Sequence, residues 1–271
     1  MPAEQPATDA TIVGLGEYAE QVATTDGRVP GERGRQTRQR LLDATVELLT
    51  TTSWRSVKVT DIARQARTSP ATFYQYFGNV EQAIRVLAEG MVDQAAQLAE
   101  LVGGDWSEDA SWDTARTVTD SFLSYWEDNR AVFRVVDLAT EEGDAELRGI
   151  RVRALNAVTV ALAQVIVAAS PSSEGTPGTS TRSPAGNDPM AVAGTLVAMF
   201  ASVSAHRYGF EFWGIRTAHL VDTQARVLHW AVTGREPPAA SGVESREATR
   251  PRTGPVLGGA TAARRRSGTT T

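Results

Sequence analysis

The sequence predicts an all-α protein, with a small N-terminal helix-turn-helix headpiece followed by a larger helical domain. Apolar residues recur at three- and four-residue spacings along most of the chain, and no strand-like alternation bounded by turns occurs. Between residues 36 and 80, helix-starting residues follow one another closely enough for three short helices and the start of a fourth. Two segments rich in Pro, Gly, Ser and Thr, 170–187 and 234–271, show no period and are expected to be a disordered loop and a disordered basic tail.

Composition limits the class of protein. The chain has 271 residues, of which 41% are hydrophobic, enough for two modest domains with real cores. No run of eighteen uncharged apolar residues and no basic start followed by an apolar run occurs, so we expect neither a membrane span nor a secretory signal. The absence of cysteine excludes disulfides, thiolate metal sites and cysteine nucleophiles. A cytoplasmic location is therefore expected.

Charge is unevenly distributed along the chain. Residues 28–72 hold nine basic and four acidic side chains, a local charge of +5, which leaves −10 for the remainder of a chain whose net charge is −5. A basic segment on an acidic body is typical of a protein that presents one end to DNA. A chance fluctuation in a solvated region is the alternative, and charge by itself leaves it open.

The first helices are predicted from their caps and apolar faces. Residues 1–33 are expected to be a disordered extension. The pattern becomes helical at Gln36, and the hydroxyl run 50–53 ends this first helix. A second short helix is expected with Thr60 as its N-cap. A third starts at Ser69, with proline at its first position, and Gly78 stops it after Phe77.

The remaining helices follow the same rules. Asn79 is expected to cap a long helix that runs to about Leu101, with Gln82 three residues on in a capping-box arrangement. Further helices are predicted at about 111–129, 130–140, 144–169, 188–208 and 216–233. We therefore divide the chain into a headpiece, 34–80, and a second domain, 81–233.

The third helix has the residues that a major-groove reader needs. Phe73 and Phe77 lie four residues apart and share a face that packs on the headpiece core, which leaves other positions for DNA. Gln75 is able to make a bidentate contact to adenine, and Ala71 fits a thymine methyl group. The hydroxyls of Thr72, Tyr74 and Tyr76 suit phosphates. The alternative, that all the aromatic residues are core, is accepted for the two phenylalanines; a helix this short cannot also bury both tyrosines.

Residues 57–77, VKVTDIARQARTSPATFYQYF, resemble the signature of the tetracycline-repressor (TetR) family of transcriptional regulators. The resemblance covers about residues 35–87 and implies a homodimer that binds double-stranded operator DNA. It implies phosphate contacts by Thr60, Thr72, Tyr74 and Tyr76, base-edge contacts by Ser69, Ala71 and Gln75, and a basic arm formed by Arg35 and Arg38. It further implies that the last two helices form a four-helix dimer interface.

Three positions depart from the family pattern. Arg67 replaces the turn glycine, which implies strain of order 1 kcal/mol or, alternatively, an added DNA contact. Thr68 replaces the valine that follows. Val80 replaces a phosphate-binding lysine, a loss that should lower the salt dependence of DNA binding by about one unit.

The second domain contains more large apolar residues than a flat packing needs. Each is more readily explained as core. The family resemblance implies that these helices enclose a ligand pocket, so some of the residues together are expected to line a cavity for a hydrophobic or amphipathic effector. Drug-like compounds, lipids and acyl thioesters all stay open. The candidate ligand contacts are Trp112, Phe122, Trp126, Phe133, Met199 and Phe200, and the same set of large apolar residues includes Phe210, Phe212 and Trp213. The three histidines lack metal-ligand spacing, so no metal and no cofactor is expected.

Together with the family resemblance, these features predict a ligand-responsive, sequence-specific regulator; the resemblance implies a repressor more often than an activator. Two recognition helices would read the half-sites of a palindrome roughly 34–36 Å apart. The resemblance further implies that effector binding would move the helix that starts after Asn79, change that spacing and lower operator affinity. The alternatives are an architectural or constitutive DNA binder without ligand response and, less favoured, a helical enzyme. No catalytic constellation or phosphate-binding glycine loop is visible in the sequence.

Overall fold

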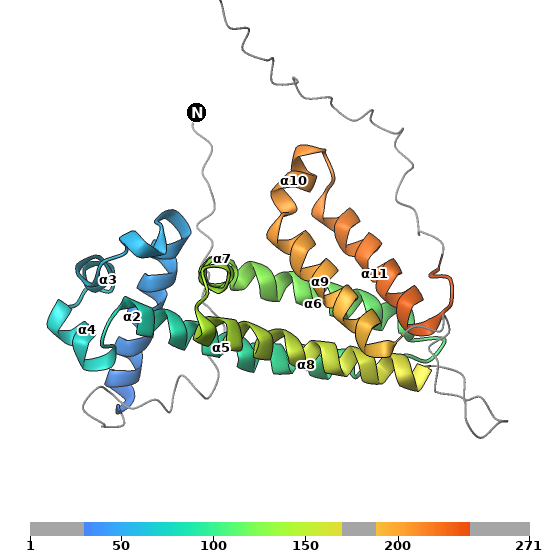
Figure 1. Ribbon diagram of the computed structural model, residues 1–271, viewed down its shortest axis with the longest axis horizontal. Coiled ribbons are helices and arrows are strands. Elements are labelled where there is room, and N and C mark those ends of the chain that lie inside the picture. Colours follow the sequence, from blue (N-terminus) through green and yellow to red (C-terminus); the bar gives the residue numbers. More distant parts are fainter. Residues whose placement is uncertain (1–29, 170–187, 239–271) are drawn as a thin grey trace, which may run out of the picture.

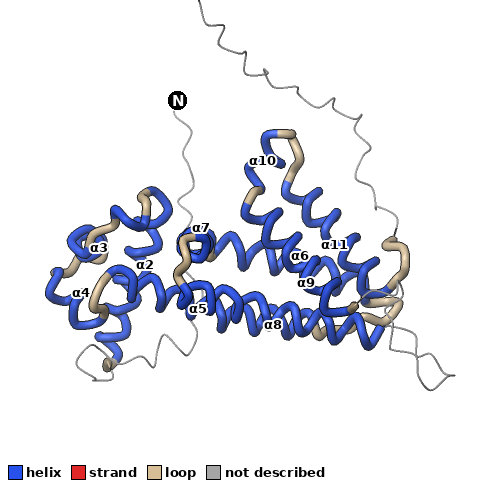
Figure 2. The backbone as a smooth tube through the Cα atoms, viewed as in Figure 1, coloured by secondary structure: helices blue, strands red, loops and turns tan. Residues whose placement is uncertain are grey.

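The computed structural model describes residues 30–169 and 188–238 of the chain, and these are helical with no strand among them (Figures 1 and 2). The all-α prediction is confirmed. The helices are α2 (Glu32–Thr51), a 3-10 turn (Trp54–Ser56), α3 (Val59–Gln65), α4 (Pro70–Tyr76), α5 (Val80–Val102), α6 (Ser111–Asp128), α7 (Arg130–Glu141), α8 (Ala145–Ala169), α9 (Pro189–Ala205), α10 (Arg207–Phe212) and α11 (Thr217–Thr233).

Helices α2, α3 and α4 form a small unit at one end of the molecule, which we call the headpiece (Figure 1). Its core contains side chains that are 0–1% exposed from all three helices, including Leu42, Ile62, Phe73 and Phe77. The spacing of these residues in the sequence places one apolar face on each helix, and burying the three faces together stabilises helices too short to persist alone.

Helix α5 leads out of the headpiece and, with α8, forms the base of the second domain (Figure 1). The two helices make the most extensive contact in the structure, and α8 also packs against α7, α9 and α11. By length and hydropathy alone α8 could cross a membrane. However, α8 packs on four other helices, as the central helix of a helical domain does, and this position explains its apolar composition.

Helices α9 and α11 form a hairpin that projects away from α5 and α8, with α10 at its tip (Figure 1). Helix α11 ends at Gly234, which adopts the left-handed conformation (φ 66°) and donates its N–H to the carbonyl of Trp230 at 2.8 Å. Glycine tolerates this conformation at little cost and so terminates the helix.

Several local predictions need correction. Helix α2 begins at Glu32, four residues before the predicted start. Thr60 is not an N-cap, because α3 begins at Val59 and the cap position is Lys58. The helix expected over 188–208 ends at Ala205, and a separate helix, α10, follows it. Residues 1–29, 170–187 and 239–271, which hold nearly all of the predicted extension, loop and tail, lie outside the described residues.

Candidate nucleic-acid interface

Helix α4 is fixed at its start by a side-chain cap and along its length by a buried aromatic face. The Ser69 hydroxyl accepts the Thr72 N–H at 3.1 Å, and Pro70 occupies the first helical position. Phe73 and Phe77 are 0% and 1% exposed, with ring centroids 5.4 Å apart. The predicted cap and the predicted core pair are therefore both confirmed, and they determine which face of α4 is turned outward.

The outward face of α4 carries the residues predicted to meet the major groove. Ala71 and Gln75 are exposed, and Tyr74 is 52% exposed, with its ring edge-on to Phe73 at 5.8 Å. Thr72 and Tyr76 are half-buried; Tyr76 packs against the core, and Thr72 shares a 2.9 Å hydrogen bond with the exposed Ser69 hydroxyl. Ala71, Tyr74 and Gln75 therefore lie together on the solvent side of α4.

The two arginines of the predicted basic arm lie in different environments. Arg35 is exposed and pairs with Glu32 at 2.5 Å at the start of α2. Arg38 is 5% exposed, with its guanidinium 5.4 Å from the centre of the Phe77 ring. In this conformation Arg38 stacks on the headpiece core, and contact with a phosphate would require its side chain to leave that position.

The turn between α3 and α4 contains a strained residue. Arg67 is exposed and has φ 54°, and it is the one non-glycine residue with positive φ among those the structure describes. The sequence predicted this strain from the replacement of a turn glycine. Thr60, also exposed, lies in the first turn of α3.

Replacing Arg67 by glycine should stabilise the headpiece. Because a left-handed backbone costs a side-chain-bearing residue about 1–2 kcal/mol, we expect Arg67→Gly to raise the free energy of unfolding by about 1 kcal/mol in urea denaturation. Ala66→Gly is the matched control, since Ala66 adopts φ −74° and should lose stability. If Arg67→Gly is less stable than the native chain, the backbone at this turn is not strained.

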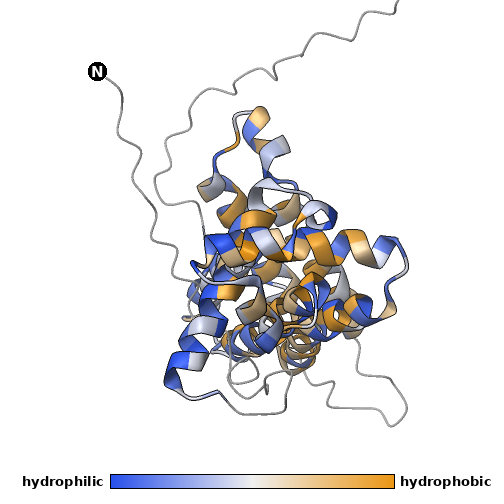
Figure 3. Cartoon of the chain, turned by 90° about the vertical axis from the view of Figure 1, so that its left-hand side faces the viewer, coloured by the Kyte–Doolittle hydropathy of each residue, from blue (hydrophilic) through white to orange (hydrophobic). Residues whose placement is uncertain are grey.

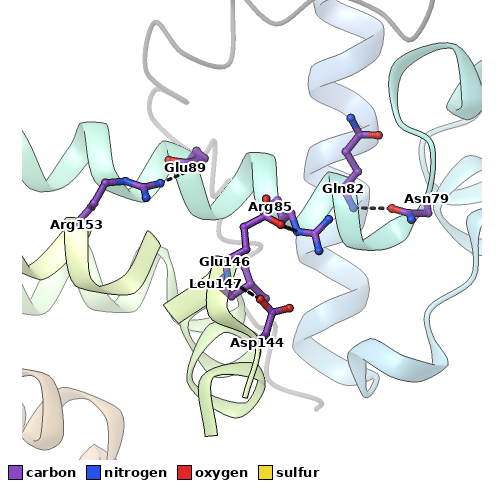
Figure 4. Close-up of polar contacts among 8 residues, drawn as sticks. All are labelled: Asn79, Gln82, Arg85, Glu89, Asp144, Glu146, Leu147 and Arg153. Carbon is purple, nitrogen blue, oxygen red and sulfur yellow. Dashed lines mark hydrogen bonds and ion pairs between the residues drawn. The ribbon is translucent and has the colours of Figure 1, made fainter. Parts of the chain in front are cut away.

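Helix α5 connects the headpiece to the second domain. Its start is capped, and two ion pairs further along join it to α8. Asn79 caps it, accepting the Gln82 N–H at 2.8 Å, while Gln82 accepts the Gly78 N–H at 2.6 Å. Further along, Arg85 pairs with Glu146 at 3.0 Å and Glu89 with Arg153 at 2.5 Å, so two ion pairs join α5 to α8 (Figure 4). These pairs join the part of α5 next to the headpiece to the first half of α8.

Helix α7 and the residue after it contact the headpiece directly, at two points that were not predicted from the sequence. Arg134 donates from its guanidinium to the carbonyl of Leu49 in α2, and Arg55, in the 3-10 turn, pairs with Glu142 just after α7. The partners are 85 and 87 residues apart in the sequence. No local spacing signals contacts between residues so far apart.

Four of the six predicted ligand contacts meet in one continuous row of rings. Phe200 of α9 contacts Phe122 of α6 at 5.3 Å between centroids, Phe122 stacks on Trp126 at 6.4 Å, and Trp126 stacks on Phe133 of α7 at 4.0 Å. All four are 1–2% exposed. Met199 is half-buried beside the same core. These four rings therefore pack against one another in the core of the second domain.

Trp112 lies apart from that row, in a polar cluster near the end of α11. Its ring meets that of His229 edge-on at 5.9 Å, and the guanidinium of Arg226 lies 5.2 Å from its centre. The Ser111 hydroxyl lies 3.2 Å from His229 Nε2 and accepts from Arg235 at 3.2 Å, and Arg235 also donates to the carbonyl of Trp106. These bonds fasten the end of α11 to the start of α6.

Stability should depend on pH through His229, which is 4% exposed. Burial, followed by the nearby charge of Arg235, holds the pKa of His229 below its ordinary value of about 6.5. The unfolded chain then binds more protons than the folded one below pH 6.5, so stability falls as pH decreases from 6.5 toward the folded-state pKa. We expect His229→Gln to flatten this decline in urea denaturation between pH 7.5 and 5.5; parallel curves for the two chains would exclude His229 as its source.

Comparison with known proteins agrees with this architecture. Residues 41–85 match the family described as "Bacterial regulatory proteins, tetR family", and residues 98–239, more than half of the chain, match "Tetracyclin repressor-like, C-terminal domain". No curated protein sequence matches the chain.

Among solved structures, the Bacillus subtilis transcriptional regulator FadR in complex with stearoyl-CoA is 18% identical, with a TM-score of 0.52 over 73% of this chain and 99% of FadR. A putative tetR family transcription regulator from Shewanella sp. PV-4 is 16% identical (TM-score 0.46; 72% and 96% covered). Thermus thermophilus FadR, a transcriptional repressor in complex with lauroyl-CoA, is 17% identical (TM-score 0.43; 76% and 100% covered). The first of these likenesses shows a shared fold. With both of its domains matched by family models, the chain belongs to the tetracycline-repressor family of bacterial DNA-binding transcriptional regulators.

Proposed function

We propose that this protein is a homodimeric repressor that reads a palindromic operator through α4 and releases it when a hydrophobic or amphipathic effector enters the second domain. The observation that carries the proposal is the two-sided character of α4, with Phe73 and Phe77 buried and Ala71, Tyr74 and Gln75 on the opposite, exposed side. A helix of this kind, capped and anchored from behind, suits insertion into the major groove.

Base reading is assigned to Gln75, with phosphate contacts by Thr60, Thr72, Tyr74 and Tyr76 and by Arg35 and Arg67, and with Ser69 and Ala71 beside the base edges. Because a bidentate amide–adenine pair is worth about 1–3 kcal/mol of discrimination, we expect Gln75→Ala to weaken binding and to relax the preference at one base pair of each half-site. Selection from random duplexes, with the native chain and the variant in parallel, measures both effects. Thr60→Ala, a phosphate-contact control, should weaken binding without changing the selected sequence. Selection of the same sequence by Gln75→Ala would remove this residue from base reading.

The outer faces of α9 and α11 support dimerisation. Helix α9 contains no charged residue, and four of its exposed positions, Ala191, Thr195, Ala198 and Ser202, follow a helical spacing. The exposed face of α11 presents a similar stripe, His219, Thr223, Val227 and Trp230, with Trp230 60% exposed. Uncharged exposed faces with small residues let two helices approach closely, and an exposed tryptophan at such a face is typical of an interface. We call these two sets of residues the hairpin stripes.

Effector binding has a direct route to the headpiece through α7. An apolar molecule inserted between Trp126 and Phe133 would push α7 away from α6, because the two rings now stack at 4.0 Å. Helix α7 carries Arg134, which binds the headpiece at Leu49, and leads to Glu142, which binds it at Arg55. Displacing α7 therefore displaces α2, and with it the spacing of the two recognition helices.

Distance measurement between the headpieces tests this route. The chain contains no cysteine, so Ser56→Cys, at an exposed position of the 3-10 turn, accepts one spin label per protomer. The probes are a long-chain acyl thioester, a fatty acid and a lipophilic cation. We expect the probe that binds, at saturation, to shift the distance between the two labels and to weaken operator binding. Arg134→Ala should reduce both effects. An effector that binds while distance and operator affinity stay constant would instead indicate constitutive DNA binding.

A further inference from the structure

Helix α10 and the residue after it form an aromatic knob that the chain itself does not cover. Tyr208, Phe212 and Trp213 are 62%, 67% and 61% exposed, and α10 contains no buried residue. No residue from 206 to 219 belongs to the buried core. Together these three side chains are among the most exposed large apolar residues of the described chain. The sequence predicted Phe212 and Trp213 as core or ligand-lining residues, and the structure contradicts that prediction.

Backbone hydrogen bonds, a ring contact and an ion pair define the shape of the knob. Trp213, Gly214 and Ile215 donate their N–H groups back to α10 carbonyls at 2.9–3.0 Å, and Gly214 adopts φ 77°. The Phe210 ring meets that of Trp213 edge-on at 5.9 Å. At the base of the knob, Arg207 pairs with Glu127 and so joins α10 to α6, and it also pairs with Glu211 within α10. These contacts define the backbone of the knob, from which the three exposed side chains project.

Its position indicates what covers it. Helix α10 lies at the tip of the α9–α11 hairpin, the part of the second domain farthest from α5 and α8, and it stands clear of the body in two views at right angles (Figures 1 and 3). The hairpin stripes end at Ser202 on one side of the knob and begin at His219 on the other. The knob therefore lies between the two stripes that we propose as the dimer surface.

We propose that the aromatic knob docks on the body of the partner protomer and extends the dimer interface beyond the hairpin stripes. This inference rests on the homodimer of the proposed function. In a two-fold contact the same surface is used by both protomers, so a hairpin that lies against its mate carries its free tip past the two-fold axis and over the partner. Three aromatic side chains, each able to bury about 150–250 Å², then leave water in both copies.

Sedimentation equilibrium of the full chain tests the contribution of the knob to dimerisation. Phe212 and Trp213 are exposed, so the double variant Phe212→Ser, Trp213→Ser should fold. Because buried interface aromatics are common hot spots, we expect its dimer dissociation constant to rise at least about 30-fold. The matched control is Val152→Ser, Val167→Ser, two exposed apolar positions of α8, which should leave the constant unchanged.

Thiol labelling then distinguishes failure of the knob from failure of the dimer. In an otherwise cysteine-free chain, Phe212→Cys should react at least about tenfold more slowly in the dimer than in the monomer produced by adding Ala198→Glu. Two results would overturn the knob proposal while leaving the proposed dimer standing. One is equal reactivity of the thiol in dimer and monomer. The other is a dissociation constant that the double variant leaves unchanged although Ala198→Glu dissociates the dimer. A native chain that is monomeric at every concentration overturns both proposals.

Discussion

Ala198→Glu should convert the protein into a folded monomer whose operator affinity is at least about 100-fold lower. Ala198 is exposed on the outer face of α9, so the single protomer accommodates a glutamate there without a change in its core. In the dimer the new carboxylates would lie in a desolvated contact without partners, which is strongly unfavourable. Losing the second headpiece removes the advantage of linked binding, which amounts to about 10²–10⁴.

The matched control is Ala96→Glu, the same change at an exposed position of α5, a helix without extensive contact with α9 or α11. It should leave both oligomeric state and operator affinity unaltered. Analytical ultracentrifugation gives the oligomeric state, circular dichroism the helicity, and a mobility shift the affinity. A helical, dimeric Ala198→Glu chain would show that the α9 stripe is not in the interface.

Phe73→Ala should unfold the headpiece, and operator binding should disappear with it. The Phe73 side chain is 0% exposed and contacts both Tyr74 and Phe77, so its truncation leaves a cavity where α2, α3 and α4 meet. Removing a buried phenylalanine costs about 3–5 kcal/mol, a large part of the stability of a unit this small. Amide hydrogen exchange in α3 and α4 and urea denaturation measure the loss.

The neighbouring residue supplies the control. Tyr74→Ala changes a 52% exposed side chain, so stability should fall by no more than about 1 kcal/mol while operator affinity decreases. Comparing Phe73→Ala with Tyr74→Ala therefore distinguishes the packing role of α4 from its role in DNA contact. Native-like hydrogen exchange in Phe73→Ala would contradict the core role, and unchanged operator affinity in Tyr74→Ala would remove that residue from the DNA surface.

The headpiece was predictable because its determinants are local. The Ser69 cap, the spacing of Phe73 and Phe77 and the replacement of a turn glycine by Arg67 each act within a few residues, and the structure agrees with all three. Thr60 was misassigned as an N-cap because threonine suits both a cap and a first turn, and α3 begins one residue earlier than Thr60. The division of the chain at residues 80 and 81 stays a prediction.

The second domain was predictable as a set of helices but not as an arrangement. Aromatic residues that look alike in sequence have opposite environments: Phe200 is 1% exposed in the ring row, whereas Phe212 is 67% exposed on α10. The break between α9 and α10 decides this difference. No proline marks it; His206 occupies it, with its ring Nδ1 hydrogen-bonded to the Ser202 carbonyl at 2.9 Å, and histidine is not a residue type from which a helix end can be predicted. The contacts of α7 with the headpiece depend on packing across the whole fold, which local periodicity does not encode.

Titration of the native chain onto a duplex obtained by selection, and onto the same duplex with one half-site scrambled, tests the central claim most directly. A dimer that reads sequence through α4 predicts two protomers per palindrome and an affinity at least about 100-fold lower on the scrambled duplex, at low and at moderate salt alike. Equal affinity for both duplexes that vanishes as salt is raised would mean that the protein binds phosphates without reading bases, and would contradict the assignment of a sequence-specific operator reader.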